Sequence, residues 1–151
     1  MASDRPARGL AVLALLAAVG VIGCGTATPI SSAQLRDRAG AICSTASAAA
    51  NAIPGPSITG MPAFLDRGVA VLSPELTALR TLHPMGVSGV TYRQALASFD
   101  AELLALGRAR ARLRAGGDPI VTTRRLQHEL AGPEASARRA WQALGIPACL
   151  A

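Results

Sequence analysis

The sequence predicts an all-α protein, an antiparallel up-down four-helix bundle that follows a cleaved signal peptide. Three observations lead to this fold class. Apolar residues recur at spacings of three and four over four long segments, breaks containing Pro and Gly separate these segments, and no long strand-like alternation occurs. Residues 32–151 are enough for one domain with a modest core.

The first 23 residues have the layout of an export signal. Arg5 and Arg8 precede an unbroken run of Leu, Ala and Val over residues 10–19, and small residues predominate in 20–25. This run is too short for a membrane-spanning helix, which needs roughly 20 apolar residues. We therefore expect a signal peptide over 1–23, with an uncleaved signal anchor as the alternative.

The four residues Val21-Ile22-Gly23-Cys24 resemble the lipobox of bacterial lipoproteins. The resemblance implies cleavage after Gly23, a diacylglyceryl group on the sulfur of Cys24, and a short tether over 24–31 at the extracytoplasmic face of the bacterial membrane. Cysteine suits this chemistry because its thiolate is the nucleophile that takes up the lipid. Two acyl chains give stable attachment. Ordinary cleavage after a small residue such as Ala27 would instead release a soluble protein.

Cysteine usage agrees with this interpretation. The chain has three Cys, and an odd number in an exported protein leaves one thiol to explain. If Cys24 carries lipid, Cys43 and Cys149 remain as a pair, in a compartment where disulfides persist. Their disulfide would close a loop of about 100 residues. In the chain-entropy model, such a cross-link stabilises the folded protein by up to ~4.7 kcal/mol. A metal site from these two cysteines is the weaker alternative, because neither has a nearby His partner.

The first two helices have clear start and stop signals. Ser31 and Gln34 fit a capping box at the start of the first helix, and Pro54-Gly55-Pro56 ends it. The second helix begins near Met61. Its apolar spacing keeps its register through Pro74, which predicts one kinked helix and not two separate helices.

The third helix is expected from about Gly89 to Ala115, where a Gly-Gly pair stops it. Asp118 caps the fourth helix and Pro119 occupies its first position. The apolar spacing passes Pro133 without losing register, so we expect a second kinked helix. Residues 144–147 end it, with Gly in the left-handed position and Ile packing back.

The residues that these spacings place inward define the expected core. Because helices joined by short loops alternate in direction, an extended tail after residue 144 would reach back to Cys43. The main inward positions are Leu35, Ala39, Ile42, Ala46, Ala49, Ile53, Leu65, Val69, Leu72, Leu76, Leu79, Tyr92, Leu96, Phe99, Leu103, Leu106, Leu113, Leu126, Leu130, Ala137, Trp141 and Leu144.

The layout of residues 35–149 is similar to that of small secreted or lipid-anchored helical proteins of high-GC Gram-positive bacteria. Gly132-Pro133 inside the fourth helix departs from that pattern. The similarity implies the helical fold and the disulfide. It adds no activity, because such proteins are largely without an assigned function. The residues that carry it are Cys43, Ala48 to Asn51, Pro74, Leu79, Leu82, Pro84, Tyr92, Gly117-Asp118, Leu144, Gly145 and Cys149.

Positive charge is concentrated near the end of the third helix. The chain has no Lys and 15 Arg, and its formal charge of +6 falls by one when the signal peptide is removed. In the bundle, Arg110 and Arg114 would lie near Arg124 and Arg125, at the end opposite the lipid. We predict that these four residues engage an anionic envelope component. The plain alternative is a set of solvated cations at a helix carboxyl end.

No residue pattern indicates catalysis, a cofactor or a metal. His83 and His128 are the only histidines, and neither has a metal-ligating residue at helical spacing. The favoured function is therefore a non-catalytic interaction or structural module of the cell envelope, bound to the membrane and without a nucleic-acid partner. The alternative is a small-molecule or lipid carrier that uses the space between kinked helices. An enzyme would need a set of residues that the sequence lacks.

Overall fold

The computed structural model describes residues 28–57 and 59–150. Over these residues the chain is all-helical, with four α-helices, a 3-10 helix and no strand. Gly23, Cys24 and the first half of the expected tether, residues 24–27, lie outside the described residues. The helices are α1 (Ser32–Asn51), α2 (Met61–Arg80), α3 (Gly86–Arg114), α4 (Pro119–Leu144) and the 3-10 helix η1 (Pro147–Leu150).

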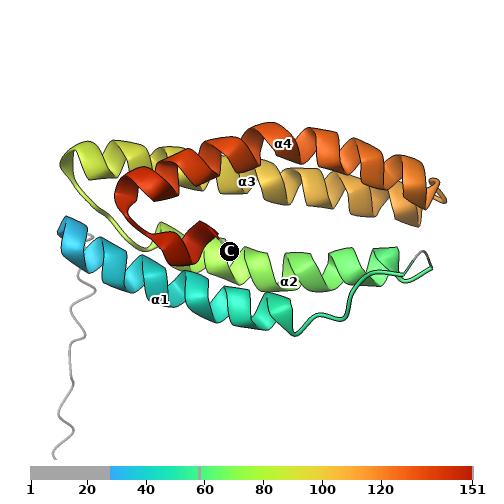
Figure 1. The fold of residues 1–151 in the computed structure, drawn as a ribbon, viewed down its shortest axis with the longest axis horizontal. Helices are drawn as coiled ribbons and strands as arrows, with labels where there is room; N and C mark the ends of the chain where they lie inside the picture. The colour runs from blue at the N-terminus through green and yellow to red at the C-terminus, as the bar shows by residue number, and fades with distance from the viewer. Residues whose placement is uncertain (1–27, 58, 151) are drawn as a thin grey trace, which may run out of the picture.

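The helices form two layers, with α1 beside α2 and α3 beside α4 (Figure 1). The loop between α1 and α2 and the turn between α3 and α4 lie at one end of the molecule. The first residues of α1 and the turn between α2 and α3 lie at the other. The short helix η1 contacts both α1 and α4.

The helix ends follow the local chemistry of the sequence. The side chain of Ser31 accepts a hydrogen bond from the backbone N–H of Gln34, whose side chain accepts one from the N–H of Ser31, and this confirms the capping box. Asp118 caps α4 through the N–H of Val121. At the other end of α4, Gly145 has φ +67°, the left-handed conformation that side chains disfavour.

Two expectations about boundaries were wrong. Helix α3 begins at Gly86, three residues before the expected start, because the N–H of Gly89 already donates to the carbonyl of Met85. The tail after α4 is not extended. Gly145 reverses the chain, Ile146 packs into the core with 1% exposure, and η1 then runs beside α1.

The larger part of the core surrounds Tyr92, whose hydroxyl donates to the backbone carbonyl of Leu79 over 2.7 Å. The ring of Trp141 packs edge-on against Tyr92 at a centroid distance of 5.8 Å. Most expected inward positions are buried or half-buried, but Ala49 is exposed because the packed stripe of α1 ends with Ala46. A smaller cluster at the other end contains Leu65, Ala105, Ala109, Leu113 and Leu126.

The disulfide between Cys43 and Cys149 is confirmed. It joins residues 106 positions apart in the sequence, with the two Cα atoms separated by 5.1 Å. Cys43 is 2% exposed on α1, and Cys149 lies in η1. The bond therefore fastens the carboxyl end of the chain to the first helix.

Candidate functional site

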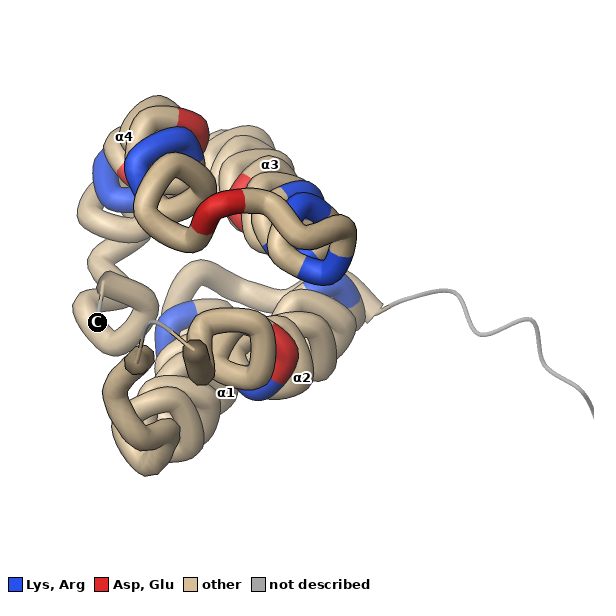
Figure 2. The backbone as a smooth tube through the Cα atoms, turned by 90° about the vertical axis from the view of Figure 1, so that its right-hand side faces the viewer, with Lys and Arg blue, Asp and Glu red and all other residues tan. Residues whose placement is uncertain are grey.

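Two regions of the fold concentrate charged side chains. The first is the basic end, which we define as the carboxyl end of α3 and the amino end of α4. Figure 2 looks at this end and shows basic positions on both helices. Its six arginines outnumber Asp66, Asp118 and Glu129 by three, and they are Arg108, Arg110, Arg112, Arg114, Arg124 and Arg125.

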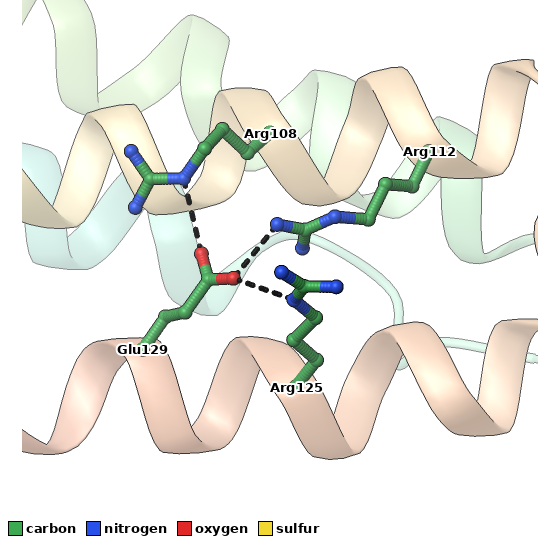
Figure 3. Close-up of polar contacts among 4 residues, drawn as sticks. All are labelled: Arg108, Arg112, Arg125 and Glu129. Carbon is green, nitrogen blue, oxygen red and sulfur yellow. Dashed lines mark hydrogen bonds and ion pairs between the residues drawn. The ribbon is translucent and has the colours of Figure 1, made fainter.

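Three of these arginines converge on Glu129 of α4 (Figure 3). Nε of Arg108 and Nη2 of Arg112, both on α3, lie 3.1 and 2.7 Å from its carboxylate oxygens. Nε of Arg125, one helical turn before Glu129, lies 3.1 Å away. Partial burial acts to raise the pKa of Glu129, but hydrogen bonds from Arg112 and Arg108 outweigh it and hold the pKa below its ordinary value.

The other face of α3 pairs with α2. Nη2 of Arg114 lies 2.9 and 3.0 Å from the two carboxylate oxygens of Asp66, and Nη1 of Arg110 lies 3.5 Å from one of them. Exposed ion pairs of this kind contribute about 0–1 kcal/mol each. Their main effect is therefore to fix the direction of the guanidinium groups.

Arg124 differs from the other predicted residues. No carboxylate of the described residues lies within ion-pair distance of it, and it lines a shallow pocket of about 230 Å³ together with apolar side chains. Ile120 is 55% exposed at the rim of this pocket, and neighbouring Val121 is 63% exposed. The lining residues are Pro56, Ser57, Met61, Pro119, Ile120, Thr123 and Arg124.

The structure thus brings the four predicted arginines to one end, but three of them already pair with carboxylates of the same chain. Asp66 and Glu129 were not predicted as these partners. Glu129 lies four residues after Arg125, and this helical spacing is a signal for one of its contacts. The contacts that cross between helices have no such local signal.

The second charged region is an acidic pocket of about 350 Å³ beside the disulfide. Glu75 from α2, Glu102 from α3 and Glu134 from α4 line it, and Arg138 supplies a cation. The apolar part of its lining includes the aromatic rings of Phe99 and Trp141, together with Cys43, Leu72, Ala137, Cys149 and Leu150. Its volume is within the range of small-molecule sites, roughly 300–1,000 Å³.

Burial and repulsion from neighbouring carboxyls keep Glu75 and Glu102 partly protonated near neutral pH. Desolvation and the nearby charge of Glu102 raise the pKa of Glu75 to about 7. Desolvation and the charge of Glu134 raise the pKa of Glu102 to about 7 as well. The pocket therefore gains negative charge as the pH rises through 7.

We expect Glu75→Gln and Glu102→Gln to stabilise the protein at pH 8. An unfolded chain ionises these carboxyls near pH 4.5, whereas the folded protein retains their protons up to about pH 7. Stability is therefore lost as pH rises through this window. Because both side chains are partly exposed, solvent screens the effect, and we expect a gain of about 1 kcal/mol for each variant at pH 8.

The measurement is urea denaturation at pH 4 and pH 8. The gain should vanish at pH 4, where both carboxyls are protonated in either state. The control is Asp37→Asn, which changes an exposed acid outside the pocket and should leave the pH dependence unchanged. An equal effect of the glutamate variants at both pH values would contradict the proposed repulsion.

Within the described ranges, no three His, Cys, Asp or Glu residues are placed to hold a metal ion. The same ranges contain no helix with both the length and the hydropathy needed to cross a bilayer. No protein-family model, curated protein or solved structure matches this chain.

Proposed function

We propose that this protein is a lipid-anchored, non-catalytic interaction module of a bacterial cell envelope. Cleavage after Gly23 would leave Cys24 as the lipid-bearing first residue, and residues 24–31 would tether the helical domain to the extracytoplasmic face of the membrane. The lipobox resemblance of residues 21–24 supports the anchor. The contacts of Ile30 with His83 and Pro84, in the turn between α2 and α3, support attachment at one end of the domain.

We also propose that the four helices pack antiparallel, up and down, and that α2 and α4 are bent. Up-and-down, antiparallel packing of the four helices is supported by the short connections between α2 and α3 and between α3 and α4. Bends in α2 and α4 are supported by Pro74 and Pro133, which each remove a backbone donor inside a continuous helix. This order separates the tether from the basic end by the length of a helix.

The basic end is the surface proposed to bind a partner. The observation that carries this proposal is Arg124, a cation without an ion pair among the described residues, beside a shallow pocket with exposed apolar side chains. Central apolar contacts next to an Arg are typical of protein binding surfaces. The excess positive charge would attract an anionic envelope polymer or an acidic face of another envelope protein.

We expect Arg124→Glu to weaken binding of poly(glycerol phosphate), used as a probe of an anionic envelope polymer. Reversing this charge leaves the ion pairs of Asp66 and Glu129 in place, so folding should be unaffected. The expected loss of affinity is about tenfold, equivalent to ~1.4 kcal/mol, and it should shrink at high salt because ions screen exposed charges. The affinity is measured by isothermal titration calorimetry of the detergent-solubilised protein at low and high salt.

Arg38→Glu is the matched control. Arg38 is an exposed arginine on α1, near the opposite end of the domain. Its replacement by Glu changes the net charge by the same amount as Arg124→Glu. A loss confined to Arg124→Glu supports a defined binding surface. Equal losses in both variants would show that only net charge matters and would overturn this assignment.

A second candidate function is favoured by the acidic pocket. Its three glutamates and the rings of Phe99 and Trp141 suit a small amphipathic cation, since a cation is attracted both to carboxylates and to aromatic faces. This would make the protein a small-molecule carrier. The pocket is partly polar, which fits a charged ligand better than a fully apolar lipid.

Dodecyltrimethylammonium, below its micellar concentration, is a probe for this second function. Binding monitored by the fluorescence of Trp141 should strengthen between pH 6 and pH 8, as Glu75 and Glu102 lose their protons. The double variant E75Q/E102Q should remove that pH dependence. Binding that is equal at both pH values would exclude the carboxyls as the recognition element.

A further inference from the structure

An exposed apolar patch lies where α3 begins. Met85 is 68% exposed, Val87 is 84% exposed and Val90 is 60% exposed. Val87 and Val90 are three residues apart on a helix and therefore point to the same side, and Met85 directly precedes this helix. We refer to these three residues as the α3 patch.

The described chain begins beside this patch. The N–H of Ile30 donates to the carbonyl of His83 over 3.2 Å, and Ile30 forms an isolated parallel bridge with Pro84. The hydroxyls of Ser32 and Ser88 are 2.9 Å apart, which joins the first turns of α1 and α3. These contacts place Ile30, near the start of the described chain, and the α3 patch at the same end of the molecule.

The packing of this end is close. A Cβ atom on Gly89 would lie 2.5 Å from the carbonyl oxygen of Pro84, so only glycine fits between the turn and the first residues of α3. Ile30 and Leu82 are buried beneath the turn. This close packing holds the residues of the α3 patch in a fixed position relative to the rest of the domain.

The chain length between Thr28 and the expected lipid limits how far the patch can be from a membrane. Thr28 is the fourth residue after Cys24, and an extended chain covers at most about 3.6 Å per residue. The acylated cysteine therefore lies within about 14 Å of Thr28. Charge at this end also suits a bilayer, since Arg36 and Arg93 form no ion pair among the described residues and would complement anionic headgroups.

We propose that Met85, Val87 and Val90 insert into the membrane surface beside the lipidated Cys24 and form a second contact that orients the domain. This inference rests on the proposed anchor. Insertion of the patch sets α3 at a fixed angle to the bilayer, and its 29 residues carry the basic end about 40 Å from the patch. The basic end then faces the envelope and not the lipid.

Quenching of tryptophan fluorescence by brominated lipid tests this proposal. The full chain, expressed in a bacterium and extracted with its lipid, is reconstituted into vesicles of phosphatidylglycerol and dibrominated phosphatidylcholine. We compare Val87→Trp with Val121→Trp, a matched change at an exposed valine of the basic end. The native Trp141 is 4% exposed in the core and gives the same background in both variants.

The indole of Val87→Trp would lie about 5–10 Å into the headgroup and acyl boundary, so we expect roughly a twofold loss of its fluorescence. Val121→Trp should lose none. Adding Val90→Asp to Val87→Trp should reduce the quenching while the protein still floats with the vesicles. If both tryptophan variants float with the vesicles and are quenched equally or not at all, the patch does not contact lipid, whereas the anchor stands. If neither floats and the Cys24 peptide carries no lipid, the anchor itself is absent and both proposals are overturned.

Discussion

The double variant C43A/C149A should lose about 4 kcal/mol of its free energy of unfolding. The disulfide spans 106 positions, and removing a cross-link of this length restores much of the entropy of the unfolded chain. Small domains have a total stability of about 5–15 kcal/mol, so the loss is a large part of the whole. Alanine avoids placing a hydroxyl at the buried position of Cys43. Guanidinium denaturation of the oxidised protein and the variant measures the difference.

Reduction of the unmodified protein is the matched control for this prediction. It breaks the same bond without changing the sequence, so its denaturation midpoint should agree with that of the double variant. The bond also lines the acidic pocket and holds η1 against α1, so its loss should expose Trp141 to added acrylamide. Equal stability of the oxidised and reduced forms would contradict the role of the disulfide as a stabilising link between η1 and α1.

We expect Leu79→Ala to destabilise the protein by about 2–5 kcal/mol. Leu79 is fully buried in the larger core cluster, and its backbone carbonyl accepts the hydroxyl of Tyr92. This hydrogen bond holds the backbone in place and prevents α2 from moving inward to fill the cavity. The cost should therefore lie towards the upper part of the range, as measured by urea denaturation.

Leu104→Ala is the control for this variant. Leu104 is a leucine of similar helical context on α3, but it is 63% exposed, so its truncation should change stability by no more than about 0.5 kcal/mol. Equal effects at the two positions would mean that Leu79 is not part of a close-packed core.

Local chemistry explains which features of the fold were predictable. The capping box at Ser31, the Asp118 cap and the left-handed Gly145 each depend on residues within four positions of one another. The pairing of Cys43 with Cys149 also followed from the sequence, because the count of three cysteines and the proposed lipid on Cys24 left only one pair.

Contacts between helices were not predictable in the same way. Glu129 forms ion pairs with Arg108 and Arg112 of α3, and Asp66 forms ion pairs with Arg110 and Arg114. The rotation of α3 about its own axis, relative to α4 and α2, determines these partners. A change of one residue in helix register would exchange these partners. The acidic pocket arises in the same way, since its three glutamates come from three different helices. Spacing along one helix carries no information about such rotation.

The two ends of the domain have different chemistry. The end where Ile30 contacts the turn between α2 and α3 presents the apolar α3 patch, and the opposite end presents arginines beside a shallow pocket. The proposed anchor at Cys24 would give this asymmetry a direction, with lipid on one side and an anionic partner on the other. The anchor is therefore the claim on which the functional account depends most.

The measurement that tests this claim most directly is the intact mass of the detergent-extracted protein, with and without reduction and alkylation, followed by mapping of its N-terminal peptide. We predict a chain that begins at Cys24 with a diacylglyceryl group, and alkylation of Cys43 and Cys149 only after reduction. An unmodified Cys24 in a full-length chain or in a soluble chain cleaved elsewhere would contradict the anchor, and with it the orientation proposed for the basic end.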